Sequence, residues 1–299
     1  MSRIHEALKK SERERLLREA KHSEPGSSEE KSSVTPARDP SAPIHSPMES
    51  FGPSVAVSKP GGTDLVLDNC VQCSWNPQST MLFFNDLQGS AGSEEFRTLR
   101  SRLFQMREQR PLRKVLVTSP LPDEGKSFVA GNLAQVIACQ KERKVLLIDA
   151  DLRRHHLHEL LGTFPTPGLS DYLLGEVDED RIMQRGPFAN LFFIPAGQPV
   201  LNPAELIANG RIKTLLNRSE PLFDWVIIDS PPAIPVSDAT LVADYCDGVL
   251  LVVRSTVTHP NAIRRTCQEF RDNQLIGVIL NGLAATSLPY YGPYSKPHA

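Results

Sequence analysis

Residues that can bind a polyphosphate follow the first strongly apolar segment of the chain. The run Val115–Thr118 is followed by turn-forming residues and then by Gly125-Lys126-Ser127, which open a predicted helix from Phe128 to Cys139. The backbone N–H groups of such a loop face a phosphate, the lysine reaches the outer phosphates, and the serine hydroxyl ligates Mg²⁺. Pro120 stands where the usual first glycine of this loop pattern would be.

Two further apolar runs end in carboxylates. Val145–Ile148 is followed by Asp149 and Asp151, and Trp225–Ile228 is followed by Asp229. Open parallel sheets bind ligands at the carboxyl ends of their strands, and carboxylates there can hold Mg²⁺ beside phosphates. Each acid alone is equally typical of a helix cap or a loop. The three segments together, in this order, favour one shared site.

These segments resemble the Walker A, A′ and B motifs of bacterial tyrosine autokinases, which act in capsule and exopolysaccharide synthesis. The resemblance covers roughly Trp75 to the C-terminus. It rests on Ser119-x-x-Pro122-x-Glu124-Gly125-Lys126-Ser127, Leu147-Ile148-Asp149-x-Asp151-x-Arg153 and Ile227-Ile228-Asp229-x-x-Pro232. The chain departs from the family at Asp123, where glycine is common. An acid there adds negative charge close to the phosphates, which bears on nucleotide affinity and not on the fold.

The resemblance implies ATP and Mg²⁺ as cofactors. The expected nucleotide-binding residues are Pro122, Asp123, Glu124, Gly125, Lys126, Ser127, Phe128 and Asn281, although Asn281 is equally typical of a turn at a strand end. Ser127, Asp149 and Asp229 are the expected metal-site residues. Lys126, Asp149, Asp151 and Arg153 are the expected catalytic residues: Asp149 deprotonates or orients the incoming hydroxyl, Asp151 acts on the metal or supports it, and Arg153 neutralises phosphate charge or organises the loop.

The fold class predicted from the alternation of elements is α/β. Runs rich in Val, Ile and Leu, separated by helical segments, are typical of a doubly wound, mostly parallel sheet covered by helices on both faces. We expect helices at 93–104, 155–161, 203–217, 237–245 and 260–272, a short helix within 168–175, and strands at 144–148, 191–195, 225–229, 248–253 and 275–281. Ser93 is expected to cap the first of these helices.

Four regions are expected along the chain. Residues 1–20 form a charged helix, interpreted either as a solvated helix or as a docking helix, and 21–74 form a disordered or extended tether rich in Ser, Pro, Glu and Gly. Within this stretch and beyond it, 65–84 could lie against the core as an extended strap. Residues 75–286 form the kinase-like domain, and 287–299 form a tail.

Two groups of residues point to self-association and modification. Glu94, Arg97 and Arg100 could be intrahelical ion pairs, but they match a Glu-x-x-Arg-x-x-Arg pattern that packs subunits of this family into a ring. Tyr290, Tyr291 and Tyr294 lie among Pro and Gly near the C-terminus. They could belong to a disordered end, but the resemblance implies a tyrosine cluster phosphorylated in trans by a neighbouring subunit.

Composition limits the remaining possibilities. A net charge of -2 argues against a general nucleic-acid binder, and no apolar run approaches the length of a membrane span. Any membrane association is therefore expected to be peripheral or through a partner. The resemblance implies a cytoplasmic protein, recruited to the inner face of the membrane by an activating polysaccharide co-polymerase. Metal or redox chemistry at Cys70 and Cys73, and a metal at His155, His156 and His158, are alternatives to incidental thiols and partly solvated histidines.

Two other functions stay open. The first is a ParA/MinD-type ATPase, an assembly or positioning switch that shares the sheet and the Walker motifs but has no kinase activity. The interface pattern and the tail tyrosines argue against it. The second is a catalytically silent scaffold that binds nucleotide weakly because of Asp123.

Overall fold

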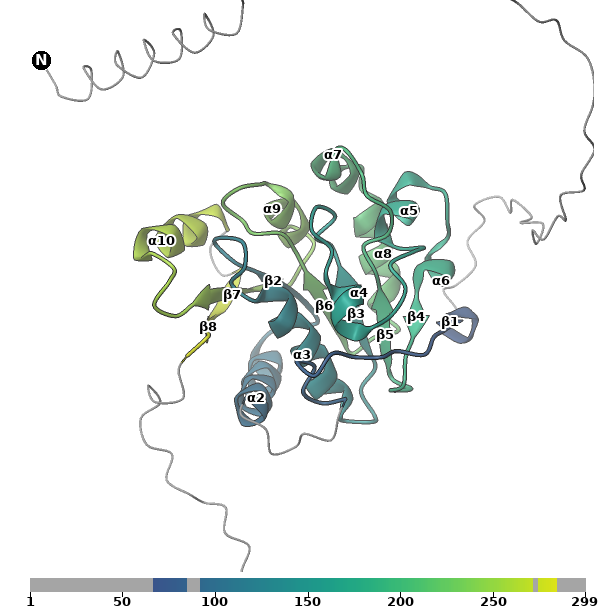
Figure 1. Ribbon diagram of the computed structural model, residues 1–299, viewed down its shortest axis with the longest axis horizontal. Coiled ribbons are helices and arrows are strands. Elements are labelled where there is room, and N and C mark those ends of the chain that lie inside the picture. Colours follow the sequence, from purple (N-terminus) through teal and green to yellow (C-terminus); the bar gives the residue numbers. More distant parts are fainter. Residues whose placement is uncertain (1–66, 85–91, 271–273, 284–299) are drawn as a thin grey trace, which may run out of the picture. The chain divides into compact units, whose positions relative to one another are not determined.

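The computed structural model describes residues 67–84, 92–270 and 274–283 (Figure 1). The predicted N-terminal helix, most of the tether and the tail tyrosines Tyr290, Tyr291 and Tyr294 lie outside these residues. The described residues all belong to one compact unit that begins at residue 61. No helix within the described ranges is both long and apolar enough to cross a membrane.

An eight-stranded sheet forms the centre of the described unit, in the order β1-β4-β5-β3-β6-β2-β7-β8. The strands are β1 Val71–Gln72, β2 Lys114–Thr118, β3 Val145–Asp149, β4 Gln184–Arg185, β5 Leu191–Ile194, β6 Trp225–Asp229, β7 Gly248–Arg254 and β8 Leu275–Asn281. All neighbours run parallel except β4 and β5, which are antiparallel. The predicted mostly parallel α/β sheet is therefore confirmed.

Alternating residues of the central strands face two separate hydrophobic cores. In β3, Leu146 and Ile148 belong to one core, whereas Val145 and Leu147 belong to the other. This alternation follows from the two-residue period of a strand, and both sets are apolar because both faces are covered.

Helices cover the two faces of the sheet in separate groups (Figure 1). The face of Val145 packs against α2 Ser93–Gln109, α3 Lys126–Ala138 and α4 Leu157–Leu161. The opposite face packs against α5 Leu169–Leu174, α6 Glu179–Ile182, α7 Pro203–Ala208, α8 Arg211–Ser219 and α9 Asp238–Ala243. The helix α10 Pro260–Glu269 precedes β8, and a short 3-10 helix, Leu67–Asn69, precedes β1.

Three local expectations were wrong. The helix expected at 203–217 is two helices, because Gly210 adopts a left-handed φ of 84° between them. Ser93 is the first residue of α2 and not its cap; Gly92, with φ 96°, occupies the N-cap position. Finally, β1 pairs with β4, so the sheet begins before the domain boundary that we placed at residue 75.

The expected strap is confirmed over residues 67–84. Trp75 and Met81 are buried in the same core as α3. The Asn132 side chain on α3 fixes the strap, because its Oδ1 accepts a hydrogen bond from Leu82 N at 2.8 Å and its Nδ2 donates to Thr80 O at 3.1 Å. Two hydrogen bonds from one buried amide hold the strap against the helix that follows the phosphate loop.

Candidate nucleotide-binding site

The register of three adjacent strands brings the predicted acids together. β3 and β2 both flank β6, and Asp149 pairs with Asp229 as the last residues of β3 and β6. The loop that follows β2 leads directly into Lys126, the first residue of α3. The carboxyl ends of these strands therefore form one site, as the topology of open parallel sheets predicts.

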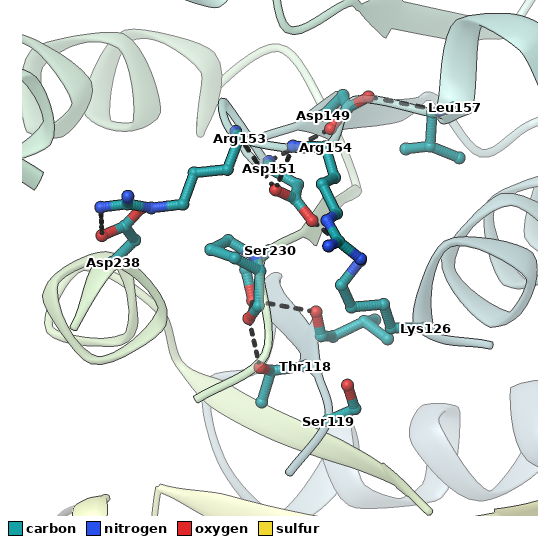
Figure 2. Close-up of polar contacts among 12 residues, drawn as sticks. Thr118, Ser119, Lys126, Asp149, Asp151, Arg153, Arg154, Leu157, Ser230 and Asp238 are labelled. Carbon is teal, nitrogen blue, oxygen red and sulfur yellow. Dashed lines mark hydrogen bonds and ion pairs between the residues drawn. The ribbon is translucent and has the colours of Figure 1, made fainter. Parts of the chain in front are cut away.

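Lys126 and Asp151 form an ion pair at the centre of this site (Figure 2). The Lys126 Nζ lies 2.9 Å from Asp151 Oδ2, and the two side chains are 12% and 2% exposed. The other oxygen of Asp151 accepts hydrogen bonds from Arg153 N and Arg154 N at 3.3 and 2.9 Å. Asp151 thus holds the lysine with one oxygen and the turn after β3 with the other.

Asp149 is fully buried, and two main-chain N–H groups hold its carboxylate in place. Its Oδ1 accepts from Asp151 N at 3.1 Å and its Oδ2 from Leu157 N at 3.3 Å. Burial raises the pKa of Asp149 well above the ordinary value, and repulsion from Asp229 and Asp151 raises it further, against the opposing effect of Lys126. The Asp149 carboxylate is therefore buried, held in one orientation and able to take up a proton.

Asp229 is a fully buried acid at the end of β6. Neither of its carboxylate oxygens has a well-formed hydrogen bond among the described residues, although the Ser127 hydroxyl lies near enough to lower its pKa. Burial raises the pKa of Asp229 to about 6, and Lys126 opposes this rise. Burial in turn lowers the pKa of Lys126, but the nearby Asp229 and Asp151 outweigh it, so that this pKa is raised.

The donor set fits a magnesium ion that is held together with phosphates. Among the described residues, no three side chains of His, Cys, Asp or Glu form a group that would bind a metal on its own. Mg²⁺ usually takes one or two protein ligands, and waters and substrate phosphates complete its shell. The unsatisfied Asp229 carboxylate beside Ser127 matches that arrangement, because a buried polar group without a partner needs an explanation.

The phosphate loop is held by the last residues of β7 and β8 and by Thr258 in the connection from β7 to α10. Arg254 Nη1 donates to Asp123 O at 3.1 Å, the Thr258 hydroxyl donates to the Glu124 carboxylate, and Asn281 Nδ2 donates to Glu124 O at 2.9 Å. Burial raises the pKa of Glu124, and the hydrogen bond from Thr258 opposes this rise. In this arrangement the Asn281 amide acts on the loop; its contact with adenine stays a prediction.

Backbone geometry explains why glycine suits this loop. Gly125 has φ 90°, and a Cβ there would lie 2.1 Å from Asn281 Nδ2. Asp123 also adopts a left-handed conformation, with φ 62°. Aspartate tolerates this region better than most residues, but glycine adopts it without steric cost. The glycine common at the position of Asp123 in the resembled family is therefore the conformationally easier residue.

Arg153 lies beside the site but is committed to another contact. Its Nε and Nη2 donate to Asp238 Oδ2 and Oδ1 at 2.7 and 3.1 Å, and Asp238 is fully buried at the start of α9 (Figure 2). Of the two roles predicted for Arg153, this contact with Asp238 favours organising the loop over neutralising phosphate charge. Sequence reasoning missed Asp238 and Thr258. Their only signal was position: Asp238 is the first residue of α9, and Thr258 lies two residues before α10.

The predicted interface residues lie on α2, away from the strand ends. Arg97 pairs with Glu94 on the same helix, and Arg100 Nη1 donates to Val136 O on α3 at 2.8 Å. Part of the Glu-x-x-Arg-x-x-Arg pattern therefore fixes α2 against α3 within one chain. The role of these residues in a ring stays a prediction.

The fold and the loop define the class of protein: a P-loop nucleotide-binding α/β protein. The kinase domain of the Escherichia coli tyrosine kinase ETK superimposes with a TM-score of 0.64 at 32% identity, over 72% of this chain and 84% of that one. The BceF tyrosine kinase domain superimposes with a TM-score of 0.58 at 30% identity, over 73% and 93%. No protein-family model matches the chain.

The chain belongs to the bacterial tyrosine-protein kinase family. The Bacillus subtilis tyrosine-protein kinase YwqD is 35% identical over 69% of this chain and 87% of its own length. The Salmonella typhimurium tyrosine-protein kinase wzc is 37% identical over 67% of this chain. The matched region spans only 28% of wzc and 33% of the putative Ralstonia nicotianae kinase EpsB.

Proposed function

We propose that the protein is an ATP-dependent protein-tyrosine autokinase. The observation that carries the proposal is the convergence of Lys126, Asp149 and Asp229 at the ends of three adjacent strands, in a chain that belongs to a tyrosine kinase family. Each of these residues has an environment that suits phosphoryl transfer. The reaction asks the protein mainly for positioning and charge neutralisation.

The loop residues would bind the nucleotide in this proposal. Backbone N–H groups from Asp123 to Phe128 would surround the phosphates beside Pro122, and Lys126 would leave Asp151 to contact the β- and γ-phosphates. Ser127 and Asp229 would hold the metal. Mg²⁺ would neutralise charge on the β- and γ-phosphate oxygens when bound. The hydrogen bonds from Thr258 and Asn281 to Glu124, which we call the Glu124 latch, would keep the loop in the conformation that binds phosphate.

Asp149 would act as the base toward the acceptor tyrosine. A proton passes from the tyrosine hydroxyl to the Asp149 carboxylate, the phenolic oxygen bonds to the γ-phosphorus, and the bond from that phosphorus to the bridging oxygen breaks, which releases ADP. A raised pKa suits this role, because a base works best when its pKa lies near the operating pH. Asp151 then holds the turn that carries Arg153.

The acceptors would be Tyr290, Tyr291 and Tyr294 of a neighbouring subunit. Each phosphate adds about -1.5 to -2 charge. Once every tail tyrosine carries a phosphate, the tail would be repelled by a site lined with Asp149, Asp151 and Asp229, and a ring packed through Glu94, Arg97 and Arg100 would loosen.

We further propose a place in exopolysaccharide or capsule synthesis or export, with a membrane polysaccharide co-polymerase as the activating partner. The protein would be cytoplasmic and would meet the membrane only through this partner. Three relatives support this setting: a putative tyrosine-protein kinase in a cps region, and the putative tyrosine-protein kinases EpsB and AmsA.

Phosphopeptide mapping tests the proposal. The full chain is incubated with ATP and Mg²⁺, with and without the cytosolic segment of a co-polymerase, and with prior phosphatase treatment. We expect phosphate on the tail tyrosines of the wild type and none on Lys126→Met. Equal labelling of the variant would refute the site, and steady ATP hydrolysis without phosphotyrosine would indicate an ATPase switch instead.

A further inference from the structure

A basic cavity opens beside the nucleotide-binding site. It has a volume of about 510 Å³ and is lined by residues 153–156 together with His158, Glu159 and Pro165. We call it the Arg-His pocket. Its walls carry two guanidinium groups and three imidazoles against a single carboxylate, so its lining chemistry suits an anion.

Internal pairs account for two of these five basic groups. The Arg153 guanidinium binds both oxygens of Asp238, and His156 Nδ1 lies 3.2 Å from Glu159 Oε2. Figure 2 shows Arg153 directed at Asp238. The groups left for a ligand are therefore Arg154, His155 and His158.

These three groups have nitrogen atoms that the described protein does not satisfy. His155 Nδ1 and His158 Nδ1 are buried without a hydrogen-bond partner, and their rings lie 5.9 Å apart. Within the described ranges, the Arg154 guanidinium forms no ion pair, whereas its main-chain N–H donates a hydrogen bond to Asp151 Oδ1 at 2.9 Å. Two buried unsatisfied imidazole nitrogens next to a guanidinium point to an absent hydrogen-bonding partner.

The pocket is joined to the proposed reaction centre by one carboxylate. Asp151 contacts Arg154 N with Oδ1 and Lys126 Nζ with Oδ2. A peptide that presents a hydroxyl to Asp149 would therefore pass near the Arg-His pocket. A group anchored there would belong to the same peptide as the acceptor.

The chain's own sequence indicates which anion that would be. Residues 284–299 contain three tyrosines and no Asp or Glu, so an anionic side chain arises there only by modification, and the proposed tyrosine kinase activity would place it on a tyrosine. Clusters of arginine are a common means of recognising phosphorylated peptides, because guanidinium groups match phosphate geometry.

We propose that the Arg-His pocket binds the phosphate of a phosphotyrosine in the acceptor peptide and so favours transfer to a second tyrosine nearby. The inference rests on the proposed kinase function. It assigns the substrate class of the second and later transfers: a tyrosine peptide that already carries a phosphomonoester. Phosphorylation of the tail would then be ordered, the first phosphate accelerating the next.

Binding to the full chain without ATP tests the pocket separately from catalysis. The probes are fluorescent peptides of residues 287–298, either unmodified or phosphorylated at Tyr294, with inorganic phosphate as competitor. We expect the phosphopeptide to bind at least about tenfold more tightly, and Arg154→Gln to remove that preference, because it deletes a charged hydrogen bond and keeps the main-chain N–H. His158→Gln should weaken binding as well, and Arg265→Gln on the exposed face of α10 is the matched control.

The same variants are then compared in phosphate transfer with ATP and Mg²⁺. The wild type should phosphorylate the primed peptide faster than the unmodified one, and Arg154→Gln should lose this ratio while remaining folded in thermal denaturation. Equal binding of the two peptides, an unchanged preference in both Arg154→Gln and His158→Gln, or complete competition by inorganic phosphate at the phosphopeptide's own concentration would overturn the proposal. Phosphopeptide preference without any transfer would instead refute the kinase function and leave the pocket standing.

Discussion

Replacing Asp229 by asparagine should stabilise the free protein while abolishing its proposed activity. In the folded chain the Asp229 carboxylate is fully buried and lacks a well-formed hydrogen bond among the described residues. Burial raises its pKa from 3.8 to about 6. Keeping it charged at neutral pH therefore costs folding free energy, which the amide of Asp229→Asn avoids.

The size of the effect follows from the pKa shift. A shift of one pKa unit corresponds to about 1.4 kcal/mol, so the rise from 3.8 to about 6 corresponds to about 3 kcal/mol at the most. For a domain of this size, that is a rise in Tm of about 6 to 12 °C. Because the folded-state pKa is raised, the folded protein binds more protons than the unfolded chain between these values. The wild type should therefore lose stability as pH rises from about 4 through 6, and the gain from the variant should grow over that window.

Thermal denaturation without nucleotide or metal, from pH 4 to pH 8, measures this difference. Glu108→Gln is the matched control, because Glu108 is an exposed carboxylate on α2. We expect the stability advantage of Asp229→Asn over the wild type to grow as pH rises. We also expect the variant to show no phosphotyrosine with ATP and Mg²⁺. A variant that is less stable than the wild type at pH 8, or a gain that does not vary with pH, would refute the electrostatic argument.

Three other predictions concern the loops that form the site. Asp123→Gly should tighten binding of Mg²⁺-ATP severalfold in calorimetric titration, because glycine adopts the left-handed conformation without steric cost and a negative charge is removed. Asp123→Asn removes only the charge and so separates the two causes. Unchanged affinity in both variants would contradict this account. Asn281→Ala should weaken nucleotide binding by about threefold to tenfold, because one hydrogen bond to Glu124 O is lost; unaltered affinity would show that the latch does not shape the loop. Asp238→Asn should lower the transfer rate by freeing Arg153, with nucleotide affinity retained; loss of nucleotide binding instead would place Arg153 on the phosphates.

The sequence predicts the central sheet well because its strands are strongly apolar and end at polar residues. The bounds expected for β6 and β8, Trp225–Asp229 and Leu275–Asn281, match the structure. The strands β1 and β4 have only two residues each and so show no periodicity to detect. Their pairing depends on the strap packing against the core, which local pattern does not contain.

The sequence predicts which residues form the site but not the side chains that hold them in place. The motifs place Lys126, Asp149 and Asp229 at three strand ends, and the strand order makes them neighbours. The sequence contains no signal that Arg153 would bind Asp238, 85 residues away, or that Thr258 would hold Glu124, 134 residues away. Such contacts arise only when distant helices pack on the sheet.

Titration of nucleotide into the full chain tests the central claim most directly. We expect Mg²⁺-ADP to bind the wild type measurably, to bind far more weakly without Mg²⁺, and to lose at least about tenfold in affinity in Lys126→Met, because a charged contact to phosphate is removed. Equal affinity for the wild type and Lys126→Met, or binding indifferent to Mg²⁺, would contradict a nucleotide site at the ends of β2, β3 and β6.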